Sequence, residues 1–205
     1  MRERSSLPGV HTSAVALDYP DPPLDDGVVR LRPWSDADLD AVVEASRDPY
    51  IPKVTTVPAP FTKGAGTRWI DRQRARRTGG TGLSFAIARS ATDEAVGGLV
   101  IIHRGKGVHG LGYWVLPSAR REAVASRAVA LVVPWAIAQG DVTELEALVE
   151  PWNEASRRVA ERAGFVAERT ARVETSVAGR RAEVIRYVLG GQSPRTGSTG
   201  PGQSR

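Results

Sequence analysis

The stretch from Leu111 to Ala136, LGYWVLPSARREAVASRAVALVVPWA, constrains the fold most strongly. Its first part, Leu111 to Leu116, is apolar and aromatic, as expected of a buried strand. Pro117 lacks an N–H and ends the pairing that such a strand can make. From Glu122 onward the apolar residues recur with a helical period, at Val124, Ala128, Leu131, Val132 and Trp135. The pattern therefore predicts a strand, a basic turn and an amphipathic helix in immediate succession.

The start of this predicted helix is a candidate anion-binding site. The first turn of a helix has backbone N–H groups without intrahelical partners, at the positive end of the helix dipole. Here those groups are expected to begin near Arg121 and Glu122, with the side chains of Arg120 and Arg121 beside them. Together they predict a cradle for a phosphate group. The two commoner phosphate loops, GxGxxG and GxxxxGK followed by Ser or Thr, do not occur in the chain.

The rest of the chain adds strands and helices in an interleaved order. Strands are expected at residues 28–32, 83–89, 95–103, 143–149, 165–173 and 182–189, and helices at 35–48, 63–77 and 153–163. With the central strand and helix the order is βααβββαβαββ. This order predicts an α+β domain in which helices cover a mixed sheet.

The folded domain is expected to span residues 28–189. Residues 1–27 contain Ser, Pro, Asp and Gly without periodicity, which predicts a flexible N-terminal arm that is mobile or bound to the surface. Residues 190–205 are rich in Gly, Ser and Pro, which predicts a disordered C-terminal tail.

The composition argues against several kinds of chemistry. Without cysteine, the chain has no thiol nucleophile, disulfide or thiolate metal ligand, and its three histidines argue against a metal enzyme. No apolar run approaches the roughly 20 residues that a membrane span needs, so a cytoplasmic location is expected. The formal net charge of +5 favours anionic partners.

The basic turn resembles a known motif. Residues Arg120 to Ala125 follow the pattern R-x-x-G-x-A, with Ala123 in place of the first glycine. This resembles motif A of the GNAT superfamily of acyl-CoA-dependent N-acyltransferases. The run GYWVLPSARREAVASRAV is similar to the branch of bacterial acetyltransferases that includes RimJ and RimL. The resemblance covers residues 28–189 and implies a mixed, mostly antiparallel central sheet flanked by helices.

The resemblance implies acetyl-CoA as the acyl donor, without a metal. The pantetheine arm would follow the central strand and the pyrophosphate the helix start, and the implied cofactor-binding residues are Trp114, Val115, Leu116, Arg120, Arg121, Glu122, Ala123, Val124, Ala125 and Ser126. Glycine lets the backbone of such loops approach a phosphate closely. An alanine in helical geometry still offers its N–H, so Ala123 predicts weaker or shifted binding of the diphosphate.

A second pattern begins at Asn153 and resembles the superfamily's N-x-x-S…GF signature, with Ser156 and the pair Gly164-Phe165 in the matching places. The resemblance implies that the asparagine contacts the pantetheine arm and that Ser156 protonates the departing thiolate. Both roles suit the donor and acceptor groups of these side chains. The alternative is purely structural, because Asn153 is also a good helix N-cap and Ser156 a plain first-turn residue.

The amine must lose its proton before it attacks a thioester, so a base or a water route is required. The superfamily often has an acidic residue two places before the Gly-Tyr of the central strand, but Gly110 occupies that position here. The candidates from the residues themselves are Glu150, which follows the strand at 143–149, and the two histidines His103 and His109. For each of them a solvated turn residue is the competing interpretation.

Three functions therefore compete. The first is an N-acyltransferase that transfers an acetyl or other short acyl group to a primary amine, on a small molecule or a protein N-terminus. This function is compatible with a homodimer, and neither a membrane nor a nucleic acid partner is expected for it. The second is a GNAT-fold module that binds acyl-CoA or a protein without catalysis, which the residues Ala123 and Gly110 suggest. The third is an RNA-binding protein that uses the arginine-rich segment 63–77, although a charge run is more often a solvated helix face.

Overall fold

The computed structural model describes residues 17–177 and 180–190. Within them one eight-stranded sheet has the strand order β1-β2-β3-β4-β5-β6-β8-β7. The strands are β1 (Leu24–Asp25), β2 (Val29–Pro33), β3 (Gly82–Arg89), β4 (Ala95–Gly105), β5 (Val108–Val115), β6 (Glu144–Val149), β7 (Val166–Val177) and β8 (Arg180–Gly190). The α-helices are α1 (Leu39–Arg47), α2 (Ile51–Val54), α3 (Lys63–Thr78), α4 (Val124–Ala138) and α5 (Glu154–Arg162), with short 3-10 helices η1 (Asp36–Asp38) and η2 (Pro117–Ala119). The predicted α+β class with a mostly antiparallel sheet is confirmed.

The centre of the sheet contains its one parallel pair within the described residues. β5 and β6 run parallel and share only three paired positions, from Val108 opposite Glu144 to Gly110 opposite Glu146. Both strands continue past the last pair, β5 to Val115 and β6 to Val149, without further pairing to each other. The two strands therefore separate at their carboxyl ends and leave an opening in the sheet, which we call the splay.

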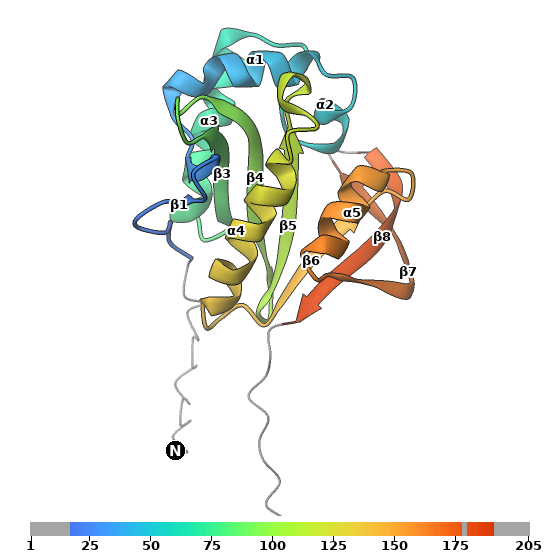
Figure 1. Cartoon of the computed structure of the whole chain (residues 1–205). Coiled ribbons are helices and arrows are strands. Elements are labelled where there is room, and N and C mark those ends of the chain that lie inside the picture. Colours follow the sequence, from blue (N-terminus) through green and yellow to red (C-terminus); the bar gives the residue numbers. More distant parts are fainter. Residues whose placement is uncertain (1–16, 178–179, 191–205) are drawn as a thin grey trace, which may run out of the picture.

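Different helices cover the two faces of the sheet (Figure 1), and each face carries its own hydrophobic core. Side chains alternate between the faces of a strand, so Phe85, Leu99 and Leu145 point to the face covered by α4 and α5. The other face packs on α1 and α3 through Trp34, Trp69, Trp114 and their neighbours. A helix on each side thus holds the sheet rigid around the splay.

The domain begins earlier in the chain than the sequence predicts. Leu17, Tyr19 and Leu24 pack against the larger core, and the Tyr19 hydroxyl donates to the carbonyl of Ser84 at 2.9 Å. Asp18 pairs with Arg77 of α3 at 2.6 Å. Residues 17–27 are therefore a bound edge of the sheet, because a few apolar side chains anchor an otherwise polar segment. Residues 1–16 of the expected arm and 191–205 of the expected tail lie outside the described residues.

Several boundaries differ from the predicted ones. β5 begins at Val108, so His109 and Gly110 are strand residues, and α4 begins at Val124, two residues after Glu122. In α5 the buried side chain is Ala160, whereas Ala155 is exposed. The described helices include none that is both long and apolar enough to cross a bilayer.

Candidate active site

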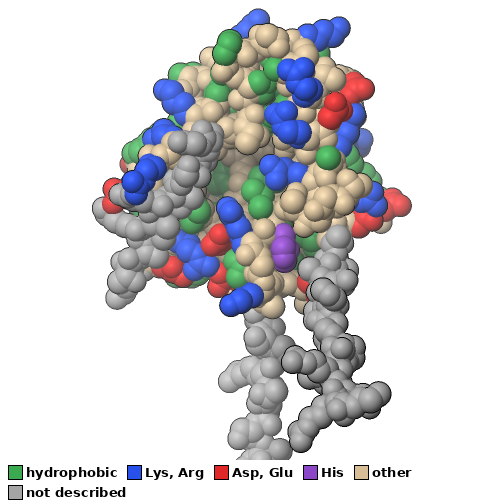
Figure 2. Space-filling view, turned by 180° about the vertical axis from the view of Figure 1, so that it is seen from behind, with side chains coloured by type: hydrophobic (Ala, Val, Ile, Leu, Met, Phe, Trp, Pro, Cys, Tyr) green, Lys and Arg blue, Asp and Glu red, His purple; other side chains and the backbone are tan. Residues whose placement is uncertain are grey.

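A cavity of about 380 Å³ lies on the α1 and α3 face of the sheet and extends into the splay. Figure 2 shows this face, with a hollow near its middle and Lys and Arg side chains around it. Glycines on the strands deepen the floor, because Gly98, Gly110 and Gly112 carry no side chain there. At Gly98 an added Cβ would lie 2.8 Å from the ring of Trp114, so this glycine allows the indole to lie across β4. The cavity is thus open to the splay on one side and walled by aromatic rings on the other.

The backbone of β5 faces the splay at alternate residues. The N–H of Leu116 donates to the carbonyl of Val96 at 2.9 Å, so Leu116 and, by alternation, Trp114 turn their backbone groups toward β4. Tyr113 and Val115 turn theirs toward the splay, beyond the last pair with β6. Of the predicted pantetheine contacts Trp114, Val115 and Leu116, only Val115 therefore presents its backbone there. The structure adds Tyr113, which sequence reasoning missed because strand register is set by pairing with β4.

The loop before α4 has an unusual backbone. Arg121 has a φ of 70° and Ala123, the N-cap residue of α4, a φ of 59°. Non-glycine residues rarely adopt this left-handed region, and such residues concentrate at functional sites. The expectation that Ala123 has helical geometry is wrong, because the chain turns sharply there to enter the helix. The first N–H groups of α4 belong to Val124, Ala125 and Ser126, which lie at the free end of the helix dipole.

The charged side chains of this loop differ in whether they already have a partner or are free to bind an anion. Arg120 donates to Asp48 at 2.6 Å and to the carbonyl of Val115 at 3.3 Å, so it ties the loop to the end of α1. Glu122 pairs with Arg89 at 2.7 Å. Arg121 is exposed, and among residues 17–177 and 180–190 no hydrogen bond or ion pair engages it. Arg121 is therefore the loop cation that is free to meet an anion, while Arg120 and Glu122 hold the loop in shape.

Asp48 is the anchor of this arrangement. Its side chain is 2% exposed and accepts hydrogen bonds from Arg120 and from the backbone N–H groups of Tyr50 and Ile51, both at 2.8 Å. Burial alone would raise the pKa of Asp48, but these donors outweigh it and leave the pKa below its ordinary value. Asp48 was not singled out from the sequence, because only the fold brings α1 next to the loop before α4.

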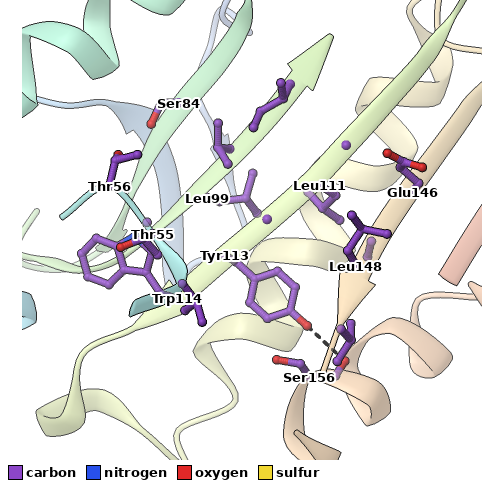
Figure 3. Close-up of a pocket in the computed structure, with 18 of the residues that line it drawn as sticks. Thr55, Thr56, Ser84, Leu99, Leu111, Tyr113, Trp114, Glu146, Leu148 and Ser156 are labelled. Atoms are coloured by element: carbon purple, nitrogen blue, oxygen red, sulfur yellow. Dashed lines mark hydrogen bonds between the residues drawn. The ribbon is translucent and has the colours of Figure 1, made fainter. Parts of the chain in front are cut away.

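The start of α5 lies beside the splay (Figure 3). The Oδ1 atom of Asn153 accepts from the N–H of Ser156 at 3.1 Å, so Asn153 does cap the helix. The hydroxyl of Tyr113 donates to the carbonyl of Ser156 at 3.1 Å, which joins β5 to α5 across the gap. Asn153, Ser156 and Tyr113 all border the cavity. The Ser156 hydroxyl has no hydrogen-bond partner within the described residues and is available to a bound molecule.

Glu150 also borders the cavity, one residue past the end of β6. Its carboxylate accepts from the Tyr50 hydroxyl at 2.7 Å and pairs with Arg180. Burial, followed by the hydrogen bond to Glu150, raises the pKa of Tyr50 to about 12, so this phenol stays protonated at neutral pH. Glu150 is thus a buried carboxylate held at the mouth of the splay.

The other predicted bases lie elsewhere. His103 and His109 face each other near the turn between β4 and β5, with ring nitrogens 3.3 Å apart, and neither borders the cavity. Burial is the main reason that the pKa of His109 is lowered. Glu146 of β6 also borders the cavity, because it is the direct partner of Gly110. The sequence did not reveal this carboxylate. The described residues contain no group of three side chains that could hold a metal ion.

The sheet thus combines a splay, a cavity that opens into it and a helix start with free N–H groups. Solved structures of acetyltransferases share this fold. A protein described as a putative ribosomal-protein-serine acetyltransferase from Vibrio cholerae has 20% identity and a TM-score of 0.71, over 84% of this chain and 99% of that one. RimJ from Mycobacterium smegmatis, in complex with CoA-disulfide, has 24% identity and a TM-score of 0.67, over 80% and 82%. The microcin C7 self-immunity acetyltransferase MccE, in complex with acetyl-CoA and AMP, has 14% identity and a TM-score of 0.69, over 82% and 94%.

The sequence also identifies the family to which the chain belongs. Residues 29–166 match the family model of the acetyltransferase (GNAT) domain, so the chain belongs to the GNAT family of acetyltransferases. The likeness in fold to RimJ agrees with the predicted RimJ/RimL-like branch. No curated protein has a sequence that matches this chain significantly.

Proposed function

We propose that this protein is an N-acetyltransferase that moves an acetyl group from acetyl-CoA to a primary amine by direct attack. The observation that carries the proposal is the splay, because a free hydroxyl and a buried carboxylate border the cavity that opens into it, and α4 begins soon after the end of β5 with free N–H groups. The complexes of RimJ with CoA-disulfide and of MccE with acetyl-CoA support the choice of donor.

The donor would enter from the side of α4 and α5. Its pyrophosphate would accept from the N–H groups at 124–126 and from Arg121, the cation without an internal partner. Its pantetheine amides would pair with the backbone of Tyr113 and Val115, as an added strand pairs with a sheet edge. The side chain of Asn153, whose Oδ1 caps α5, would contact the same arm. The thioester would then lie in the splay beside Ser156.

The acceptor amine would come from the cavity. In the proposed reaction its nitrogen attacks the thioester carbonyl, a C–N bond forms, and the C–S bond of the tetrahedral intermediate breaks. The Ser156 hydroxyl gives its proton to the departing thiolate and is reprotonated from solvent. Glu150 receives the proton of the amine, directly or through water, since it alone of the predicted bases borders the cavity. The reaction needs no covalent intermediate on the protein.

The first test is binding and turnover with acetyl-CoA. Ligand linkage predicts about 2.7 kcal/mol of added stability at a concentration one hundred times the dissociation constant, which a thermal shift measures. Because the chain has no cysteine, a thiol reagent reports released CoA without a signal from the protein. We expect both a shift and amine-dependent thiol release. A thermal shift without release for any amine would indicate the non-catalytic acyl-CoA-binding module, and no shift at millimolar acetyl-CoA would contradict the proposal.

A second prediction concerns the left-handed alanine. Ala123→Gly should tighten acetyl-CoA binding several-fold, because without a Cβ the loop can approach a phosphate more closely. It should also raise stability, because glycine adopts the observed φ of 59° without the roughly 1–2 kcal/mol steric cost. Isothermal titration calorimetry on both proteins measures the change.

The matched control is Ala125→Gly, which lies inside the first turn of α4 and should lower stability by about 1 kcal/mol, with no gain in affinity. If both glycine variants changed affinity equally, the backbone of Ala123 would not limit binding.

A further inference from the structure

Arg76 is a cation inside the cavity rather than on its rim. One face of α3 carries Trp69, Gln73 and Arg76, at the spacing that points them to the same side. Trp69 and Gln73 are buried, and Arg76 is partly buried behind them. The Oε1 atom of Gln73 accepts from Nε of Arg76 at 3.1 Å and so directs the guanidinium. Other arginines of this helix differ, since Arg74 pairs with Asp36 and Arg77 with Asp18.

No carboxylate in the described residues forms an ion pair with Arg76. Burial, and then the nearby charge of Arg72, lower its pKa, which is the direction expected of a cation whose charge nothing compensates. A partly buried guanidinium costs free energy unless an anion meets it. Its two terminal nitrogens remain available as donors to such an anion.

Two hydroxyls on the same side of the cavity are oriented as donors too. The indole N–H of Trp34 donates to Oγ of Ser84 at 3.2 Å, and that of Trp69 donates to Oγ1 of Thr56 at 3.1 Å. Each hydroxyl thus accepts a hydrogen bond from a tryptophan. The proton of the hydroxyl itself is donated to no acceptor in the described part of the chain. Arg76, Ser84 and Thr56 therefore form a donor-rich end of the cavity, which carries a positive charge.

The opposite side of the cavity carries two carboxylates that are paired with arginines, Glu146 with Arg104 and Arg186, and Glu150 with Arg180. Glu146 and Glu150 border it from the side of β6, where the amine must arrive to reach the splay. In Figure 3 Thr56 and Ser84 lie on one side of the cavity and Glu146 on the other. β3 and β6 are three strand spacings apart, or about 14 Å between backbones. Side chains reach inward from both strands and narrow this distance. An acceptor therefore needs a spacer of only several bonds between its amine and its anionic group.

On the basis of the proposed acetyltransferase function, we propose that the acceptor is a small amine that also carries an anionic group, a carboxylate or a phosphate, which binds to Arg76, Ser84 and Thr56. The amine then lies in the splay, beside Glu150, and the apolar middle of the acceptor packs against Trp34 and Trp114. The charge of Arg76 selects such acceptors, because a neutral amine of the same shape leaves the guanidinium without a partner.

The test compares amines that differ only in the anionic group. Alanylalanine is matched with its C-terminal amide, and 2-aminoethyl phosphate with ethanolamine, so the two pairs separate a carboxylate from a phosphate. We expect kcat/KM for the anionic member of at least one pair to exceed that of its neutral partner by about 10- to 100-fold. Arg76→Gln should remove this preference, and Arg76→Lys, which keeps the charge, should retain part of it.

Arg68→Gln is the control, since Arg68 lies on the same helix but does not line the cavity, and it should keep the preference. Equal kcat/KM for both members of both pairs, or an equal loss for both in Arg76→Gln, would overturn the proposal.

Calorimetry of the same amines without acetyl-CoA decides the question independently of turnover. If the wild type acetylates nothing but binds an anionic amine that Arg76→Gln does not bind, the transferase proposal fails and the anion site stands. If wild type and Arg76→Gln bind the anionic amines alike, the anion site fails.

Discussion

Replacing Ser156 with alanine is expected to lower kcat by about 10²- to 10⁴-fold, the range that general acid catalysis contributes, while the affinity for acetyl-CoA stays within a few fold. The Ser156 hydroxyl borders the splay and has no hydrogen-bond partner among the described residues, so it is free to protonate a thiolate. Tyr113 is poorly suited to that task. Its hydroxyl already donates to the Ser156 carbonyl. Steady-state kinetics with calorimetry separate the two effects.

Ser118→Ala is the matched control, because Ser118 is exposed and lies outside the cavity, and its activity should equal that of the wild type. Equal losses of kcat and acetyl-CoA affinity in Ser156→Ala would identify the serine as a group that positions the donor. Unchanged kinetics would leave it as an ordinary first-turn residue of α5.

The second large effect is expected at Asp48, where alanine should lower the free energy of unfolding by about 3 kcal/mol. The change leaves the N–H groups of Tyr50 and Ile51 without an acceptor, and an unsatisfied buried donor costs about 1–3 kcal/mol. It also removes the carboxylate that holds Arg120 and hence the loop before α4. Urea unfolding measures the loss. Asp40→Ala, in the first turn of α1, is the control and should stay near the wild type.

The same residue predicts a dependence on pH. The folded-state pKa of Asp48 lies below its ordinary value, so its stabilisation is present above about pH 4 and is lost as the pH falls through the lowered folded pKa. The difference in stability between the wild type and Asp48→Asn should therefore be largest near neutral pH and should shrink in acid. A difference that stays constant from pH 7 to pH 3 would mean that Asp48 acts through its shape and not through its charge.

Sequence patterns located most of the elements because the signals are local. The apolar period at 124–135 predicts α4, and Val124, Ala128 and Val132 are indeed buried. Prediction was weaker where a boundary depends on a turn. The left-handed residues Arg121 and Ala123 delay the start of α4. Neither is a glycine, the residue that usually marks such a turn in a sequence. The sequence also left open whether residues 17–27 are mobile or bound, since three apolar side chains in a polar segment give no periodic signal.

The residues that surround the splay show where local reasoning ends. Asn153 and Ser156 were predicted through the resemblance to the N-x-x-S…GF signature, and Glu150 because it follows a recognisable strand. Arg76 was visible only as one of several arginines in a charged helix, and the fold alone shows that it points into the cavity while Arg77 pairs at the surface.

The sequence by itself determined most of the order of the elements, though not β1 or α2, and the family resemblance, because each depends on residues close together in the chain. It also predicts that the start of α4 binds an anion. Only the tertiary structure decided which groups meet in the cavity. Pairing between β4 and β5 sets which backbone groups of β5 face the splay, and the three-residue ladder between β5 and β6 sets where the splay opens. Glu146 beside Gly110 and Arg120 on Asp48 are contacts between distant segments, which only long-range packing can bring together.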